Sequence, residues 1–104
     1  MDILHITQDN YESEVASSPV PVLLDFFATW CGPCRTLAPI LEGLAAENPG
    51  FRIAKVDVDE APDLARKFGI MTVPTLVVIR DGEEVRRASG VRPKAALLAL
   101  VYGE

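Results

Sequence analysis

The sequence lacks the basic character of proteins that bind nucleic acids. It has 10 Lys and Arg against 15 Asp and Glu, which gives a formal net charge of -5. Its basic residues form no cluster larger than isolated pairs such as Arg66-Lys67 and Arg86-Arg87. Nucleic acids and anionic membrane surfaces are bound through clustered Lys and Arg. We therefore expect neither to be a main partner of this chain.

Long apolar runs are also missing. No run approaches the roughly 20 apolar residues that a helix needs to span a bilayer. The first residues, Met1 to His5, lack the basic segment and the apolar segment of a secretory leader. We therefore expect the protein to be cytoplasmic, in a compartment where protein disulfides are usually transient and catalytic.

Metal-binding residues are scarce. His5 is the only histidine, and the chain has two cysteines in all. A zinc site usually takes four ligands, and a second Cys or Cys/His pair is absent. We expect no metal, and a metal shared across a dimer is the remaining alternative.

The two cysteines lie together in Trp30-Cys31-Gly32-Pro33-Cys34, at the point where an apolar strand is expected to give way to a helix. Helical residues three apart have Cα atoms roughly 5 Å apart, which is inside the range of roughly 4.4–6.8 Å for a disulfide. The pair can therefore close and open a disulfide without large backbone movement. A Cys-x-x-Cys motif beside a βαβ pattern indicates redox chemistry.

A chain of 104 residues is expected to form a single domain over residues 1–104. Its pattern predicts the order βαβαβαββα, with a largely parallel sheet and a terminal antiparallel hairpin turning at Asp81-Gly82. The nearly continuous apolar run Val20–Ala28 predicts a central strand buried on both faces. The other expected strands are Ile3–Ile6, Phe51–Asp59, Thr75–Ile79 and Glu84–Ala88. The expected helices run from about Thr7 to Ala16, from the cysteines to near Asn48-Pro49-Gly50 with Pro39 inside, from Pro62 to Lys67, and from Pro93 to about Tyr102.

The two cysteines are not expected to be equivalent. Cys31 would lie at the helix N-terminus, where unpaired N–H groups and the positive end of the helix dipole favour a thiolate. Cys34 lies one turn further in, closer to the core. We therefore assign Cys31 as the attacking nucleophile and Cys34 as the resolving thiol.

Asp25 stands inside the apolar central strand, between Leu24 and Phe26. A buried carboxylate is costly to ionise, so the pKa of Asp25 is expected to be raised, which suits a proton acceptor near neutral pH. The alternative is a carboxylate at a strand end that faces solvent.

The chain resembles the thioredoxin family. Trp30-Cys31-Gly32-Pro33-Cys34 matches the active-site motif of that family residue for residue, and the resemblance covers about Ile3 to Tyr102. Further matches in order and spacing are Asp25, Pro39, Lys55, Val73-Pro74-Thr75 and Gly90.

The resemblance implies an α/β thioredoxin fold, in which a mixed five-stranded sheet of order 1-3-2-4-5 is flanked by about four helices. It also implies a thiol-disulfide oxidoreductase that reduces protein disulfides and carries electrons for redox homeostasis. Its redox group would be the Cys31-Cys34 disulfide, with no bound cofactor. A separate thioredoxin reductase, drawing on NADPH, would recharge it, and the chain would work as a monomer.

Roles for further residues also follow from the resemblance. Asp25 would help to deprotonate Cys34, and Lys55 would lie near Asp25 and tune its titration. From the sequence alone, Lys55 is equally a charged residue on the polar face of a strand. The Val73-Pro74 bond would be cis, with Val73 backbone groups free to pair with an extended substrate. Trp30, beside a cysteine expected to be exposed, would rim an apolar substrate surface together with Gly32, Pro33, Val73, Pro74, Gly90 and Val91.

The chain departs from the commonest family pattern at three places: Phe27, Met71-Thr72 and Val91-Arg92-Pro93. These residues bear on target range and on the choice of reductase. Two other functions remain open alongside the reductase. One is a thiol oxidant or isomerase of the same fold, and the other is a binding subunit without redox turnover.

Overall fold

Strand β2 lies at the centre of a five-stranded sheet, as its apolar run predicts. The computed structural model describes residues 2–47 and 49–103, and its strand order is β1-β3-β2-β4-β5, which confirms the order that the resemblance implies. The strands are β1 (Leu4–His5), β2 (Val22–Phe27), β3 (Arg52–Asp57), β4 (Thr75–Arg80) and β5 (Glu83–Ser89). The helical elements are η1 (Glu12–Ala16), a π-helical turn, α1 (Gly32–Ala46), α2 (Pro62–Lys67) and α3 (Lys94–Tyr102).

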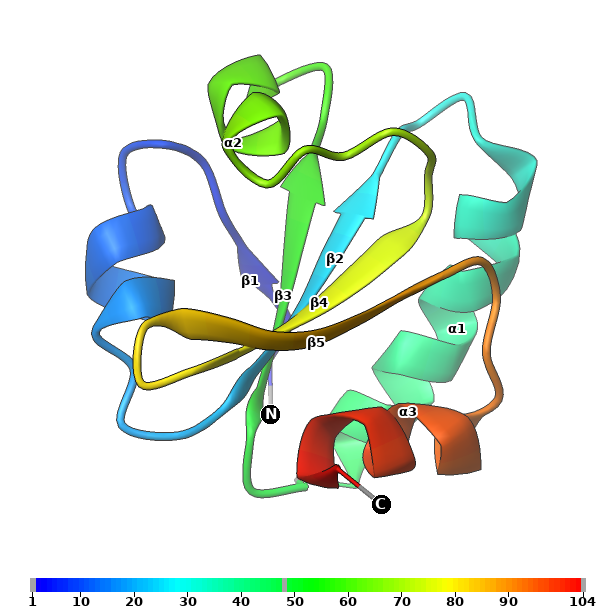
Figure 1. The fold of residues 1–104 in the computed structure, drawn as a ribbon. Coiled ribbons are helices and arrows are strands. Elements are labelled where there is room, and N and C mark those ends of the chain that lie inside the picture. The colour runs from blue at the N-terminus through cyan, green and yellow to red at the C-terminus, as the bar shows by residue number, and fades with distance from the viewer. Residues whose placement is uncertain (1, 48, 104) are drawn as a thin grey trace.

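The direction of the strands brings three chain segments to one edge of the sheet. β2 runs parallel to β3, with Phe27 opposite Asp57 at their carboxyl ends. β2 runs antiparallel to β4, with Phe26 opposite Thr75. The carboxyl ends of β2 and β3 therefore meet the amino end of β4, and the start of α1 follows β2 at the same edge (Figure 1).

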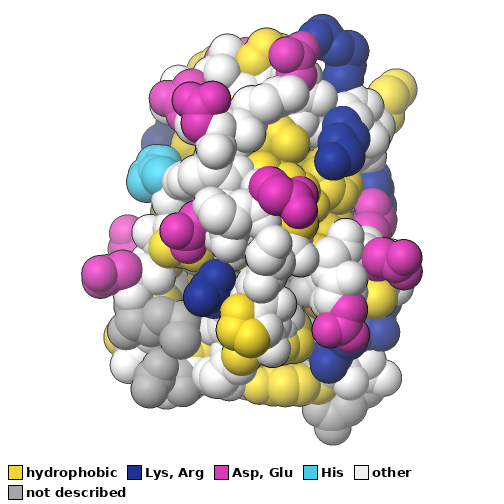
Figure 2. Space-filling model, turned by 90° about the vertical axis from the view of Figure 1, so that its left-hand side faces the viewer, with side chains coloured by type: hydrophobic (Ala, Val, Ile, Leu, Met, Phe, Trp, Pro, Cys, Tyr) yellow, Lys and Arg dark blue, Asp and Glu magenta, His cyan; other side chains and the backbone are white. Residues whose placement is uncertain are grey.

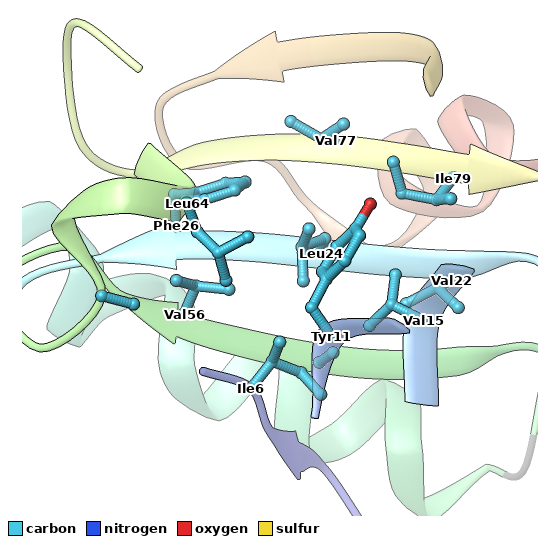
Figure 3. Packing of buried hydrophobic residues seen from close by; sticks show 12 residues of the cluster. Ile6, Tyr11, Val15, Val22, Leu24, Phe26, Val56, Leu64, Val77 and Ile79 are labelled. Atoms are coloured by element: carbon cyan, nitrogen blue, oxygen red, sulfur yellow. The ribbon is translucent and has the colours of Figure 1, made fainter. Parts of the chain in front are cut away.

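Each face of the sheet is covered by helices. Alternate residues of β2 point to opposite faces, so Leu24 and Phe26 pack with Tyr11 and Val15 of the η1 side and Leu64 of α2. Figure 3 shows Tyr11 reaching over the strands towards Leu24. Leu23 points the other way, into a second cluster under α1 and α3. The helical residues of that cluster are Leu37, Leu41, Leu44, Ala45, Leu97 and Val101.

Most predicted boundaries hold within two residues, and α2 has the predicted bounds. The first helix is the main difference, since it begins at Glu12 instead of about Thr7. Asn10 Oδ1 accepts a hydrogen bond from the Thr7 N–H at 2.8 Å, which makes a turn where a helix start was expected.

Several elements are shorter than predicted, and β3 and α1 illustrate this. β3 ends at Asp57 instead of Asp59, because Asp57 Oδ1 accepts the Asp59 N–H at 2.9 Å and turns the chain. α1 ends at Ala46, and Asn48 of the predicted break lies outside the described residues.

On the face on the side of η1, acidic side chains are spread over the surface, and several basic side chains lie towards the upper right of the view. Hydrophobic atoms are visible between them (Figure 2). Within residues 2–47 and 49–103, no helix is long and apolar enough to cross a membrane.

The packing under α1 generates a first prediction. Leu41 is fully buried and Glu42, the next residue on the same helix, is exposed. We expect Leu41→Ala to lower the free energy of unfolding by about 2–5 kcal/mol, because it removes buried methyl groups and leaves a cavity. Glu42→Ala should change it by less than about 0.5 kcal/mol. Urea denaturation measures both, and equal effects of the two substitutions would contradict this account of the core.

Candidate redox site

Cys31 and Cys34 are joined by a disulfide at the start of α1, and their Cα atoms are 5.3 Å apart. The distance fits the helical spacing that the sequence predicts. Cys31 is the N-cap of α1, with an extended backbone, and Cys34 lies in the first turn. Both sulfur atoms therefore belong to one rigid turn, directly after the central strand.

The helix start polarises the two sulfur atoms differently. The backbone N–H of Cys34 donates a hydrogen bond to Cys31 Sγ at 3.1 Å. This is the contact that an N-cap side chain makes with an N–H lacking a helical partner. In the reduced protein, the same N–H and the helix dipole favour negative charge on Cys31. Position on the helix therefore separates the two cysteines.

Cys31 and Cys34 do not differ in burial. Cys31 is 4% exposed and Cys34 is 3% exposed, so the expectation of an exposed Cys31 is wrong. Val58 and Val73 pack against the pair and cover it. A substrate therefore reaches Cys31 through contact with these neighbours.

The segment before β4 closes over the disulfide. The Val73-Pro74 peptide bond is cis, as the resemblance implies. The carbonyl oxygen of Val73 lies 3.6 Å from Cys31 Sγ, so a group bonded to that sulfur lies next to the Val73 backbone. Pro74 is buried, however, and lies behind the expected rim instead of on it.

Gly90 supports this segment from the neighbouring strand. Its N–H donates to the Pro74 carbonyl at 2.9 Å. Its φ of 86° is in the left-handed region, which favours glycine over residues with a side chain. Val91 beside it is 40% exposed, and the two residues lie near the end of β5 that pairs with the start of β4.

Trp30 is 67% exposed, as expected at this corner. Its Nε1–H donates to Asp59 Oδ2 at 2.8 Å, a contact that sequence reasoning missed. The parallel register of β2 and β3 could have indicated this contact. Phe27 lies opposite Asp57, so residues two or three positions beyond each strand end emerge side by side.

An open apolar pocket borders the disulfide on the Trp30 side, and we call it the side pocket. Sequence reasoning missed it because its walls come from three separate segments. It is lined by Trp30, Val58, Ala65, Ile70, Met71, Thr72 and Val73. Met71, at 91% exposure, stands at its rim.

Asp25 is fully buried, on the face of the sheet that α1 covers. Among the described residues, neither of its carboxylate oxygens has a hydrogen-bond partner. Burial raises the pKa of Asp25 to about 7, and the positive charge of Lys55 opposes part of that rise. A carboxyl group with this pKa can take and return a proton near neutral pH.

Lys55 lies directly opposite Asp25 in the parallel pairing of β2 and β3. No ion pair joins these two described residues. The Lys55 Nζ lies instead 4.4 Å from the centroid of the Phe27 ring, a cation–π contact. Lys55 shares a surface pocket with Cys34, Phe27 and Ala38, so an ammonium group and the second cysteine face the same opening.

The residues that the structure describes form no group of three or more His, Cys, Asp or Glu placed to hold a metal ion. The site combines a disulfide with a buried carboxyl group of raised pKa and apolar neighbours.

Comparison with known proteins agrees with this geometry. The Thioredoxin family model matches residues 2–102. A thioredoxin of Chlamydia muridarum is 47% identical over 96 residues, which are 92% of this chain and 92% of that protein. A thioredoxin of Mycobacterium tuberculosis is 46% identical over 91% of this chain and 83% of its own length. A bifunctional thioredoxin reductase/thioredoxin of Mycobacterium leprae is 44% identical over 91% of this chain, and the match covers 21% of that protein.

The buried carboxyl group predicts a pH-dependent stability. The folded protein keeps the Asp25 proton up to a pKa of about 7, against the ordinary value of 3.8. The folded state therefore binds more protons than the unfolded state between these values, and stability falls as pH rises through that window. The separation corresponds to about 4 kcal/mol.

We expect Asp25→Asn to remove this loss. The difference in unfolding free energy between Asp25→Asn and the wild type should grow in favour of the variant from about pH 4 to pH 7 and level off above. Urea denaturation across pH 4 to 9 measures it, with Asp9→Asn on the surface as control. A pH-independent difference would contradict a raised pKa at Asp25.

Proposed function

This chain belongs to the thioredoxin family and is a thiol-disulfide oxidoreductase, and we propose that it reduces protein disulfides through an attack by Cys31 that Cys34 resolves. The observation that carries the proposal is the disulfide itself, closed between the N-cap of α1 and its first turn. The Cys34 N–H on Cys31 Sγ supports Cys31 as the thiolate that attacks.

The reaction has two exchange steps. In the first, the Cys31 thiolate attacks one sulfur of the substrate disulfide, a Cys31–substrate disulfide forms, and the other substrate sulfur leaves as a thiolate that takes a proton. In the second, the Cys34 thiolate attacks Cys31 Sγ, the Cys31-Cys34 disulfide forms, and the remaining substrate sulfur leaves. Two electrons pass from the protein dithiol to the substrate, and the chain ends in the oxidised state that the structure contains.

Asp25 is the proposed acceptor of the Cys34 proton. Its buried carboxylate has a pKa of about 7 and no competing hydrogen bond. Lys55, which lowers that pKa through its positive charge, would tune the transfer from the edge of the site. The opening that Lys55 shares with Cys34 supports an exchange of the proton with solvent there.

The proposed substrate surface surrounds Cys31. Its exposed members are Trp30, Gly32 and Pro33, and its half-buried members are Val73 and Gly90, with Pro74 behind them. A surface of this kind suits brief contacts with many extended segments. The Val73 carbonyl beside Cys31 Sγ would align the substrate backbone.

Reducing equivalents would come from a separate thioredoxin reductase that draws on NADPH. The name of the Mycobacterium leprae relative, which joins a reductase and a thioredoxin in one protein, supports such a partner. We further propose that residues 1–104 act as one monomeric domain in the cytoplasm. The net charge of -5 is consistent with protein substrates and not with nucleic acid.

The assignment of the cysteines predicts that Cys34→Ser traps substrates. With the resolving thiol gone, the first exchange stops at the disulfide between Cys31 and the substrate. We expect a covalent adduct, seen by mass spectrometry and reversed by dithiothreitol, with any accessible protein disulfide. Cys31→Ser is the matched control and should accumulate no such adduct.

Trapping that ran equally through Cys34 would reverse the assigned roles. Equilibration of the wild type with glutathione separates the reductase from an oxidant of the same fold. A reduction potential above about -200 mV would indicate an oxidant or isomerase.

The proton acceptor predicts a slower second step in Asp25→Asn. Loss of general-base assistance should slow release of the second substrate thiol about 100-fold at pH 7. The wild-type rate should rise with pH as Asp25 ionises near pH 7, and the variant should lose that inflection. Stopped-flow fluorescence of Trp30 can follow the step, with Asp9→Asn as control. Equal rates and profiles in Asp25→Asn and the wild type would remove Asp25 from the mechanism.

A further inference from the structure

The side pocket continues the surface that meets the substrate. Val58 and Val73 pack against the cluster that contains Cys31, and both also line the pocket. A substrate bonded to Cys31 Sγ lies beside the Val73 carbonyl, 3.6 Å from that sulfur. Because Val73 lies beside that sulfur and also lines the pocket, the side pocket adjoins the place where the residue next to the substrate cysteine would bind.

The chemistry of the pocket favours an apolar occupant. Its lining residues carry no formal charge, and all but Thr72 are apolar. Asp59 lies at its edge, where its Oδ2 accepts a hydrogen bond from the Nε1–H of Trp30. An acidic substrate side chain would lose water against the apolar lining and would face the negative charge of Asp59.

Met71 gives the pocket its outer wall. The side chain is 91% exposed, although large apolar groups are normally covered. Methionine is unbranched and polarisable, so it can adapt to apolar side chains of different shape. Its position at the rim means that a substrate side chain entering the pocket passes over it.

We propose that Met71 is a specificity-determining residue, which selects substrates that carry an apolar side chain next to the reacting cysteine and disfavours acidic ones. The inference rests on the proposed reductase function and names the substrate class of that same site. Met71 acts through contact with the flanking side chain and takes no part in the exchange of sulfur bonds.

The test uses disulfide-linked peptides that differ in one residue beside the cysteine: Leu, Ser, Lys or Glu. Two series place that residue before or after the cysteine, because either chain direction can align with Val73. The proteins are the wild type, Met71→Leu, Met71→Lys and the control Val85→Lys. Val85 is 41% exposed on β5, near the hairpin end that lies away from the paired Thr75 and Ser89. Rates with hydroxyethyl disulfide, which has no flanking residue, normalise any general effect at Cys31.

In at least one series we expect the wild type to favour Leu over Glu about tenfold in kcat/KM, the scale on which one apolar contact discriminates. Met71→Leu and Val85→Lys should keep that ratio, and Met71→Lys should abolish or invert it. A wild type without preference, or a ratio unchanged in Met71→Lys, would overturn the role of Met71 and leave the reductase intact. A wild type that reduces none of the disulfides would overturn both.

Discussion

The position of β2 is the constraint on which the rest of the molecule depends. The strand is buried on both faces, pairs in parallel with β3 and pairs in antiparallel with β4. These pairings bring the carboxyl ends of β2 and β3 to the amino end of β4. The segments that follow or precede those ends carry the cysteines, Asp59 and Val73. A single buried strand therefore assembles a site from parts of the chain that are more than 40 residues apart in sequence.

The same burial places an unfavourable group in the core. Asp25 occupies a β2 position whose neighbours are apolar, and its oxygen atoms have no hydrogen-bond partner. Such a group is costly to ionise, and proteins tolerate that cost mainly where chemistry needs it. The proposed proton transfer from Cys34 is the chemistry that would account for Asp25 in this strand.

Sequence patterns predicted most of the helices and strands, and the order of the strands in the sheet was implied by the family resemblance. The apolar run of β2, the proline at the start of α2 and the Asp81-Gly82 turn are local signals, and they hold in the structure. The same kind of reasoning placed the start of the first helix too early, because Asn10 lies in a turn where the helix was predicted to begin. Local sequence patterns predict where helices and strands form, but they do not predict which side chains pack against one another in the folded chain.

In the candidate site, too, some features follow from local sequence and others depend on contacts between distant segments. The spacing of Cys31 and Cys34 fixed their Cα separation, because both residues lie on one helical turn. The other features of the site depend on the meeting of three chain segments, which no single stretch of sequence encodes. These features are the burial of Cys31 and Pro74, the Trp30–Asp59 hydrogen bond and the side pocket.

The helical turn that holds both cysteines also bears on how a partner can distinguish the oxidised from the reduced protein. The 5.3 Å spacing already suits a bonded pair, so the disulfide can open with little backbone movement. Gain or loss of two electrons is therefore expected to alter the structure mainly at the two sulfur atoms. A partner that distinguishes the oxidised from the reduced form would then have to bind next to this turn.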